Sequence, residues 1–478
     1  MTEQWQLDPD RALPADPTTR DLARTIYRHA ATLPLVSMHG HVDVDLFADN
    51  QAFGDPAELL ITPDHYLVRM LVSQGYRHAE LGVPHRDRDS GGDPVERDPR
   101  AIWRRFCENW HLFRGTPTRY WLEHELAEIF ELPAPPSAKN ADVLYDQLAE
   151  TLQRADFRPL ALLDRMNVQI LATTDSALSD LSSHGRLARQ LGPARIVPTF
   201  RPDSLVHVGH HAWTAEVDRL AEVSGVDTGD YQGFLAALRQ RRRAFIDAGA
   251  RATDHGHLTA DTTPLPTASA ERIYRDALAG NVSPADTEAF AAHMLFQMAE
   301  MSAEDGLVMQ LHPGVLRNHS GEIYRQHGPD QGFDVPVRVE FTRSLRPLLE
   351  KFGLSDRFRC ILFTTDETVY SRELAPLAGA YPSVRLGAPW WFLDSPEQMR
   401  RFRESAVETA GFYNTSGFVD DTRAFASIPA RHDLSRRIDA GYLAKLVAEA
   451  RLGMDEAMDT MVDLAHRLAL TAYAAPHD

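Results

Sequence analysis

Cysteine, lysine and long apolar runs are all scarce in this sequence of 478 residues. The two cysteines, Cys107 and Cys360, are too few for a disulfide framework. No apolar run approaches the roughly 18 residues that a membrane-spanning helix needs, and the polar, acidic residues 1–21 do not resemble a signal peptide. These absences exclude a disulfide-rich secreted protein and predict a cytoplasmic protein with no membrane partner.

The charge balance is strongly negative, with a formal net charge of −18. Such a field repels nucleic acids and anionic membranes, so neither is an expected partner. Of the 50 basic residues only Lys139, Lys351 and Lys445 are lysines, which leaves 47 arginines. Because a guanidinium binds carboxylate or phosphate bidentately, a local group of arginines still suits a small anion. A glycine-rich phosphate loop is absent, which favours a carboxylate.

Eight extended runs alternate with amphipathic segments along the chain. We expect strands at residues 33–43, 168–175, 194–203, 250–257, 306–314, 359–367, 383–392 and 411–421. One intervening helix is expected to begin after Ser283, as its N-cap, and to end at Gly306. Eight strands that alternate with helices predict an α/β fold, a parallel (β/α)₈ barrel.

The first crossover, from residue 44 to residue 160, is too long for a single helix. Its periodic segments predict a helical insertion over the barrel mouth. It is not an independent domain, because the barrel cannot close without the strands on either side. We therefore divide the chain into a leading helix with the first strand (1–43), the insertion (44–160), the rest of the barrel (161–430) and closing helices (431–478). The segment "RHDLSRR" at 431–437 is expected to be a solvated helix face.

Two histidines one residue apart end the first predicted strand, in "PLVSMHGHVD". Side chains at i and i+2 of a strand project to the same side, so His39 and His41 would converge on one metal ion. Taken alone, they fit a surface pair as well. His312 ends the fifth predicted strand and Asp421 the eighth, at matching depths, and imidazoles with a carboxylate suit zinc or manganese.

The number of ions follows from the scarcity of lysine. Binuclear hydrolases of similar fold often bridge their ions with a carboxylated lysine from a barrel strand. None of the three lysines lies in a predicted strand. We therefore expect one divalent ion, most readily zinc, with manganese as the alternative.

Three arginines stand at or just past predicted strand ends and are candidates for binding an anion. Arg423 follows Asp421 by two residues, so both side chains would enter one cavity of an extended chain. Arg201 in "TFRPD" and Arg317 in "HPGVLRNHS" would converge there. The alternative is a set of unrelated surface arginines in an arginine-rich protein.

Two aromatic residues are further candidates for the site. Tyr66, in "DHYLVRML", is by default a packing residue, but its phenol could act as an acid if the insertion caps the barrel mouth. Trp390, in the pair Trp390–Trp391, offers a flat wall for a sugar ring, although tryptophans at strand ends are equally often core residues.

Several of these segments, taken together and in order, resemble the uronate isomerase (glucuronate isomerase) family of the amidohydrolase superfamily. The resemblance covers nearly the whole chain and is carried by "HGH", "DHYLVRM", "MNVQILATTD", "PTFRPD", "ATDHG", "QLHPGVLRN", "APWWFLD" and "VDDTRAFASIPARHDLSRRI". Each segment is a modest signal, but the set in register is specific.

The resemblance implies a mononuclear, zinc-type enzyme that interconverts an aldose uronate and a ketose uronate, such as D-glucuronate and D-fructuronate or D-galacturonate and D-tagaturonate. It implies His39, His41 and Asp421 as metal ligands, with His312 near the metal or the substrate. Arg201, Arg317 and Arg423 would bind the anion, and Tyr66 and Asp254 would be polar residues of the active site. A homo-oligomer is expected, as is common for such enzymes.

The implied reaction moves a proton between C2 and C1 through an enediolate. Asp421 or a hydroxide on the metal is the candidate base, and Tyr66 or His312 would relay the second proton. The same residues also fit a metal-dependent hydrolase or lactonase acting on a sugar acid. A catalytically inactive sugar-acid-binding protein is disfavoured, because every matched ligand position holds a competent residue.

Overall fold

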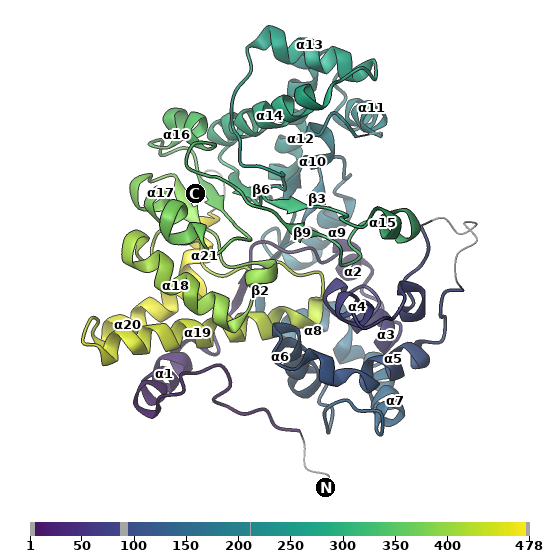
Figure 1. Cartoon of the computed structure of the whole chain (residues 1–478), viewed down its shortest axis with the longest axis vertical. Coiled ribbons are helices and arrows are strands. Elements are labelled where there is room, and N and C mark those ends of the chain that lie inside the picture. Colours follow the sequence, from purple (N-terminus) through teal and green to yellow (C-terminus); the bar gives the residue numbers. More distant parts are fainter. Residues whose placement is uncertain (1–4, 87–93, 211, 475–478) are drawn as a thin grey trace.

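Short parallel strands lie at the centre of the molecule, and helices surround them (Figure 1). The computed structural model describes residues 5–86, 94–210 and 212–474. Two hydrogen-bonded strand orders, β1-β2-β4 and β3-β5-β6-β7-β10-β11, run in sequence order. Their bounds are β1 (Leu35–Ser37), β2 (Val168–Ala172), β3 (Asp175–Ser176), β4 (Ile196–Val197), β5 (Phe200–Arg201), β6 (Ala252–His255), β7 (Val308–Leu311), β10 (Cys360–Leu362) and β11 (Val384–Leu386).

The last extended segment of the chain closes the ring between β11 and β1. On one side Thr415 forms a parallel bridge with Leu386 of β11. On the other side the amide of His41 donates to the carbonyl of Thr422 at 2.9 Å. Because β2 and β3, and likewise β4 and β5, are consecutive pieces of one run, the predicted eight-membered parallel barrel is confirmed.

The eighth predicted strand, residues 411–421, does not form a regular strand, and this part of the prediction is wrong. Gly417 (φ 76°) and Asp421 (φ 43°) lie in the left-handed region of backbone space. Left-handed residues interrupt the alternation of an extended chain. Only the bridge at Thr415 is therefore recorded there as β structure.

Helices cover the outside of the barrel and follow the strands along the chain (Figure 1). They are α9 (Ser182–Leu191), α10 (Asp203–Val206), α11 (Trp213–Ser224), α12 (Tyr231–Asp247), α13 (Thr267–Leu278), α14 (Pro284–Asp305), α16 (Arg346–Phe352), α17 (Ala375–Ala380) and α18 (Pro396–Ala410). As predicted, Ser283 caps α14, with its hydroxyl accepting from the Asp286 amide, and Gly306 (φ 83°) ends the helix. An antiparallel hairpin of β8 (Val315–Leu316) and β9 (Val335–Pro336), with α15 (Gly321–His327) between its strands, follows β7.

The residues between β1 and β2 form helices and turns only, within the described part of 44–160. The helices are α2 (Val44–Asp49), α3 (Pro56–Leu60), α4 (His65–Val72), α5 (Pro99–Glu108), α6 (Pro117–His124), α7 (Ala141–Leu152) and α8 (Pro159–Arg165). At the ends of the chain, α1 (Pro17–Ala30) packs on the closing helices α19 (Ile428–Ala448) and α20 (Met454–Val462), and α21 (Leu468–Ala472) comes last. The division into domains stays a prediction.

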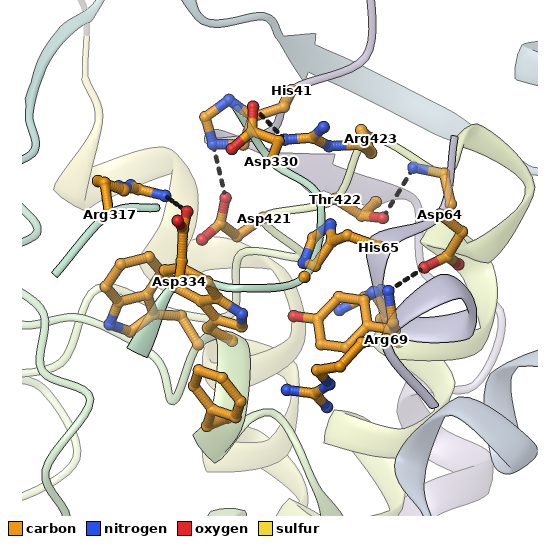
Figure 2. Close-up of a pocket in the computed structure, with 17 residues that line it drawn as sticks. His41, Asp64, His65, Arg69, Arg317, Asp330, Asp334, Asp421, Thr422 and Arg423 are labelled. Carbon is orange, nitrogen blue, oxygen red and sulfur yellow. Dashed lines mark hydrogen bonds and ion pairs between the residues drawn. The ribbon is translucent and has the colours of Figure 1, made fainter. Parts of the chain in front are cut away.

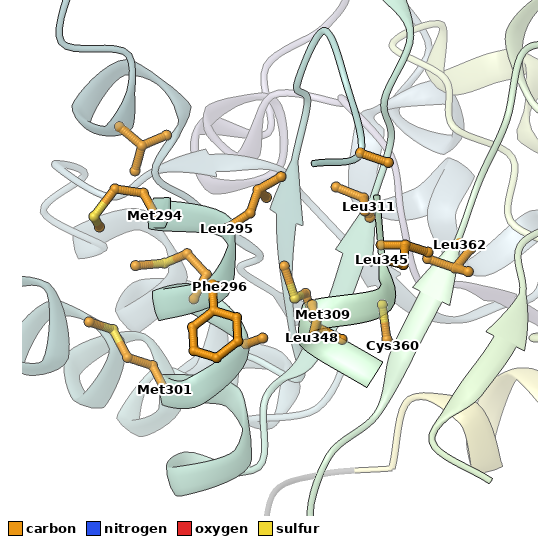
Figure 3. Packing of buried hydrophobic residues seen from close by; sticks show 14 of the residues in the cluster. Met294, Leu295, Phe296, Met301, Met309, Leu311, Leu345, Leu348, Cys360 and Leu362 are labelled. Carbon is orange, nitrogen blue, oxygen red and sulfur yellow. The ribbon is translucent and has the colours of Figure 1, made fainter. Parts of the chain in front are cut away.

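Alternating apolar residues position the strands. Leu35 of β1 packs outward with the insertion helices, whereas Val36 faces the barrel interior with Ile170 of β2. On the opposite wall, Met309 of β7 and Cys360 of β10 pack under α14 and α16 (Figure 3). This packing makes the barrel a rigid frame on which loops beyond the strands present polar side chains.

Two expectations about the chain concern its cysteines and its longest helices. Cys107 and Cys360 are both buried and free, which agrees with the absence of a disulfide framework. None of the helices within the described ranges has the length and the apolar character that are needed to cross a bilayer.

Candidate active site

Two imidazoles and one carboxylate meet where the end of the barrel returns to its beginning. His39 and His41 follow β1, and Asp421 lies in the closing segment beside them. The Asp421 Oδ1 atom lies 3.3 Å from His39 Nε2 and 3.0 Å from His41 Nε2. The structure therefore brings together the first and last candidate motifs of the chain, which are 380 positions apart in the case of His41 and Asp421.

The backbone at Asp421 explains how its side chain is aimed. Its φ of 43° is unusual for a residue with a side chain, although aspartate tolerates this region better than most. The amide of Asp421 donates to the carbonyl of His39 at 3.2 Å, which ties the strained residue to the histidine segment. The extended backbone that we expected between Asp421 and Arg423 is thus absent, but both side chains still line the same pocket.

The three groups fit a divalent metal ion. One ligand atom from each of His39, His41 and Asp421 lies within 4.8 Å of the others. Burial raises the pKa of Asp421, but His39 and His41 together outweigh burial and hold that pKa well below its ordinary value, so the carboxylate is charged. A second set, His39 with Asp254 and His312, lies directly beside the first. Buried His312 Nε2 has no hydrogen-bond partner, which leaves a nitrogen available beside the site.

A continuous series of contacts links His312 to Asp254, Arg201 and Asp203. His312 Nδ1 donates to Asp254 Oδ1 at 2.7 Å, because the carboxylate can only accept. Asp254 Oδ2 lies 3.2 Å from Arg201, whose Nε donates to Asp203 at 2.8 Å. Burial raises the pKa of Asp254, but Arg201, His312 and His39 together outweigh burial and keep that pKa well below the ordinary value. His312 is consequently held in one orientation and one tautomer.

A pocket opens beside Asp421, which is one of its lining residues (Figure 2). Arg317 and Arg423 both line it, and each is held by an aspartate of the hairpin segment after β7. Arg317 lies 2.9 Å from Asp334, and Arg423 lies 3.2 Å from Asp330. Two guanidinium groups beside the metal donors suit an anionic ligand.

Arg201 is not among the residues that line this pocket. Its guanidinium lies between Asp203 and Asp254, and Asp254 in turn accepts from His312. The structure therefore unites two of the three candidate arginines. Arg201 stays a predicted anion ligand, and its contacts here orient Asp254.

Tyr66 and Trp390 both line the pocket. Tyr66 comes from the first turn of α4, and burial raises the pKa of its phenol above the ordinary value, so the hydroxyl keeps its proton. The Trp390 ring stands edge-on to His312, with centroids 4.7 Å apart. The insertion thus contributes Tyr66 to this pocket, and its role as a cap over the barrel mouth stays a prediction.

The segment "RHDLSRR" is not a solvated face, and that prediction is wrong. It lies within α19, and Arg431, His432 and Arg436 are buried. Arg431 lines the pocket, forms an ion pair with Asp394, and places its guanidinium carbon 3.6 Å from the centroid of the Trp121 ring. Burial of charge is possible here because each charged group finds a partner on another element.

Several pocket residues escaped the sequence analysis, namely Asp64, His65, Asp330, Asp334 and Arg431. His65 belongs to the quoted segment "DHYLVRML", so its neighbour Tyr66 was a usable signal. Burial lowers the pKa of His65 to about 3, so its ring is neutral, and neither ring nitrogen has a partner. Asp330 and Asp334 lie in an irregular loop with no periodic pattern to mark them.

Known proteins resemble this chain over almost its whole length. A family model described as glucuronate isomerase matches residues 18–470. A uronate isomerase from Rhizobium meliloti (strain 1021) is 53% identical over 98% of this chain and 99% of its own. The crystal structure of glucuronate isomerase from Caulobacter crescentus superposes with a TM-score of 0.94 at 46% identity, covering 98% of this chain and 97% of that one.

A more distant solved structure supports the same assignment. The crystal structure of uronate isomerase from Thermotoga maritima has a TM-score of 0.90 at 26% identity and covers 98% of this chain and all of that one. The similarity spans the barrel, the insertion and the closing helices. The chain belongs to the glucuronate isomerase family.

Proposed function

We propose that the pocket beside His39, His41 and Asp421 interconverts an aldose uronate and its ketose uronate, with D-glucuronate and D-fructuronate or D-galacturonate and D-tagaturonate as the candidate pairs. The observation that carries this proposal is the placement of two arginines, Arg317 and Arg423, in the same pocket as the metal donors. The enzyme is an aldose–ketose isomerase, and its curated relatives are named for uronates. A homo-oligomeric state and a cytoplasmic location stay predictions.

His39, His41 and Asp421 would hold one divalent ion, with zinc favoured over manganese by two imidazoles and one carboxylate. The chemistry that such an ion supplies is Lewis-acid polarisation of the substrate oxygens. In this assignment Asp421 is the candidate base for the proton at C2. Its pKa, held well below the ordinary value, means that the carboxylate carries no proton before the reaction begins.

The remaining residues divide the tasks of orientation and proton delivery. Arg317 and Arg423 would hold the C6 carboxylate, which fixes the reacting end of the sugar by a remote charge. Tyr66 keeps its proton and can donate it at the pocket wall. His312 offers a free Nε2, while Asp254 holds its Nδ1 hydrogen. Trp390 closes the wall behind His312 and excludes water.

Proton exchange in D₂O tests the reaction class. With D-glucuronate and the metal-loaded enzyme, we expect the NMR signal of the C2 proton to be moved or lost as the ketose forms. A hydrolase or lactonase would leave that proton in place, because its chemistry occurs at a carbonyl carbon. Heat-denatured enzyme with the same metal is the control for uncatalysed exchange. An unchanged C2 signal alongside turnover would contradict the proposal.

Substitution of a pocket arginine tests recognition of the carboxylate. For Arg423→Met we expect KM to rise about 10- to 100-fold, because a charge-assisted hydrogen bond contributes roughly 1.5–3 kcal/mol. The matched control is Arg343→Met, since Arg343 is an exposed arginine paired with Glu340 outside the pocket. Steady-state kinetics on a uronate measures both variants. Equal KM values would remove Arg423 from substrate binding.

A further inference from the structure

We propose that the chain holds a second divalent-cation site, formed by Asp203, His255 and His257. One ligand atom from each of these residues lies within 4.8 Å of the others. The site shares no residue with the catalytic donor sets, which are built from His39, His41, Asp254, His312 and Asp421. The inference does not depend on the proposed reaction.

The local backbone explains why these three side chains meet. His255 is the last residue of β6, next to Asp254, and successive side chains of a strand point to opposite faces. Asp254 is directed at His312, so His255 projects to the other face, away from the catalytic donors. His257 follows two residues later, and Asp203 begins α10, after β5. The amide of Gly256 donates to Asp203 at 3.0 Å, which fastens the two loops together.

Both imidazoles have a ring nitrogen that is buried and has no hydrogen-bond partner. These atoms are His255 Nδ1 and His257 Nε2, and the two residues are 0% and 5% exposed. A buried polar atom without a partner costs free energy, so native structures normally satisfy it. A metal ion bound between the rings and Asp203 would satisfy both nitrogens at once.

The second nitrogen of His255 supports the same assignment. His255 Nε2 lies 2.9 Å from the hydroxyl of Thr253, which is buried on the same face of β6. Donation of the Nε2 hydrogen to Thr253 leaves the lone pair on Nδ1, directed at the cluster. Metal-bound histidines commonly donate their other N–H to such a partner, which fixes the ring.

The protonation states suit a cation. Burial lowers the pKa of His255 to about 4 and that of His257 well below its ordinary value, so both rings are neutral. Burial raises the pKa of Asp203, but Arg201 and the neighbouring histidines together outweigh burial and lower that pKa, so the carboxylate is charged. Two neutral imidazoles and one carboxylate form a donor set of the zinc type.

Arg201 is the opposing charge and must be considered. It donates through Nε to Asp203 Oδ2 at 2.8 Å, and its Nη1 lies 3.2 Å from Asp254. One guanidinium therefore serves two carboxylates, and within the described residues the hydrogen bond recorded for Asp203 Oδ1 is from the Gly256 amide, at 3.2 Å. A carboxylate oxygen has room for a further partner, so Asp203 can bridge the guanidinium and an ion. In a tetrahedral site with 2.0–2.1 Å bonds the donors lie roughly 3.3 Å apart, so binding draws them inward.

The experiment measures Co²⁺ and Zn²⁺ bound to the full-length protein. The His39→Asn/His41→Asn variant lacks both histidines of the His39–His41–Asp421 site, and we expect it to bind one equivalent after dialysis, with the visible d–d absorption of Co²⁺ in a nitrogen and oxygen site. Wild type should bind two equivalents. Adding His257→Gln to the double variant should remove the absorption and reduce bound metal to zero.

Two further variants keep the test decisive. His257→Gln alone, with the catalytic donors intact, should bind one equivalent. His293→Gln is the matched control, because His293 is equally buried but both its nitrogens have partners, Tyr231 and the Leu265 amide; it should keep two equivalents. Circular dichroism and thermal melting show that each variant is folded. One equivalent in wild type, or two in His257→Gln, would overturn the site and would identify the cluster as neutral histidines packed around the Asp203–Arg201 pair.

Discussion

Asp421→Asn is expected to lower kcat on a uronate by about 10³-fold or more. The amide cannot accept the C2 proton, and a lost acid–base group alone costs about 10²- to 10⁴-fold. Asn also removes the negative charge that His39 and His41 share, at 3.3 Å and 3.0 Å. Kinetics and metal analysis should be run on the same preparation, because loss of the metal and loss of the base give different results. A variant that keeps its metal but not its turnover identifies Asp421 as the base.

Asp366→Asn is the matched control for this substitution. Asp366 also follows a barrel strand, β10, but its Oδ1 accepts from the amide and hydroxyl of Thr368 and lies outside both catalytic donor sets. We expect turnover and metal content close to wild type. Near-normal activity of Asp421→Asn would remove Asp421 from the mechanism, whatever its place at the metal.

The barrel and its metal donors could be predicted because their signals are local and repeated. Each strand carries an apolar run, and the chemistry-bearing residues stand just beyond it, as in the histidine pair after β1. Barrel topology then brings the first and last strand positions together without any local signal that links them. The contacts of His39 and His41 with Asp421 show that the two ends of the barrel sequence meet in this way here.

What could not be predicted depends on loops and on pairing across elements. Asp330 and Asp334 lie in the irregular segment inside the β8–β9 hairpin. They belong to the site because they form ion pairs with the two pocket arginines. Gly417 and Asp421 have positive φ values in the segment that closes the ring, and no apolar pattern marks these two residues in the sequence. Local sequence propensities carry no information about either effect.

Arg431 shows the same limit for a helix. A mixture of Arg, His and Asp normally indicates a solvated face, since charged residues are rarely buried without a partner. In α19 the partners come from other parts of the chain, with Asp394 beside Arg431 and Asp420 beside His432. The helix is buried around much of its circumference, so amphipathic periodicity, the usual sign of its orientation, is missing.

Arg431→Met is expected to lower the free energy of unfolding by about 3–5 kcal/mol, because removal of one partner leaves Asp394 as a buried charge without compensation. The contact of the guanidinium with Trp121 is lost as well. Burial already raises the pKa of Asp394 to about 7 against the opposing effect of Arg431, so loss of the arginine raises it further. A raised carboxyl pKa means that the folded state binds the proton more tightly, so stability falls as pH rises.

The destabilisation should therefore be larger at pH 8 than at pH 5. At pH 8 the unfolded state releases the Asp394 proton, whereas the folded variant must either keep that proton or bury an unpaired charge. At pH 5 the folded variant holds Asp394 protonated and uncharged. Urea unfolding at both pH values measures the difference. Arg431→Met/Asp394→Asn should recover part of the loss and should lack most of its pH dependence, because the carboxyl that pairs with Arg431 is then gone. Burial raises the pKa of Asp64 and of Glu125, and Arg431 opposes that rise, so these two carboxyls keep a smaller pH dependence. Arg346→Met, which removes an exposed pair with Glu350, should cause no measurable change at either pH. A loss of equal size at pH 5 and pH 8 would show that packing against Trp121 and Tyr66, and not the charge on Asp394, makes Arg431 necessary.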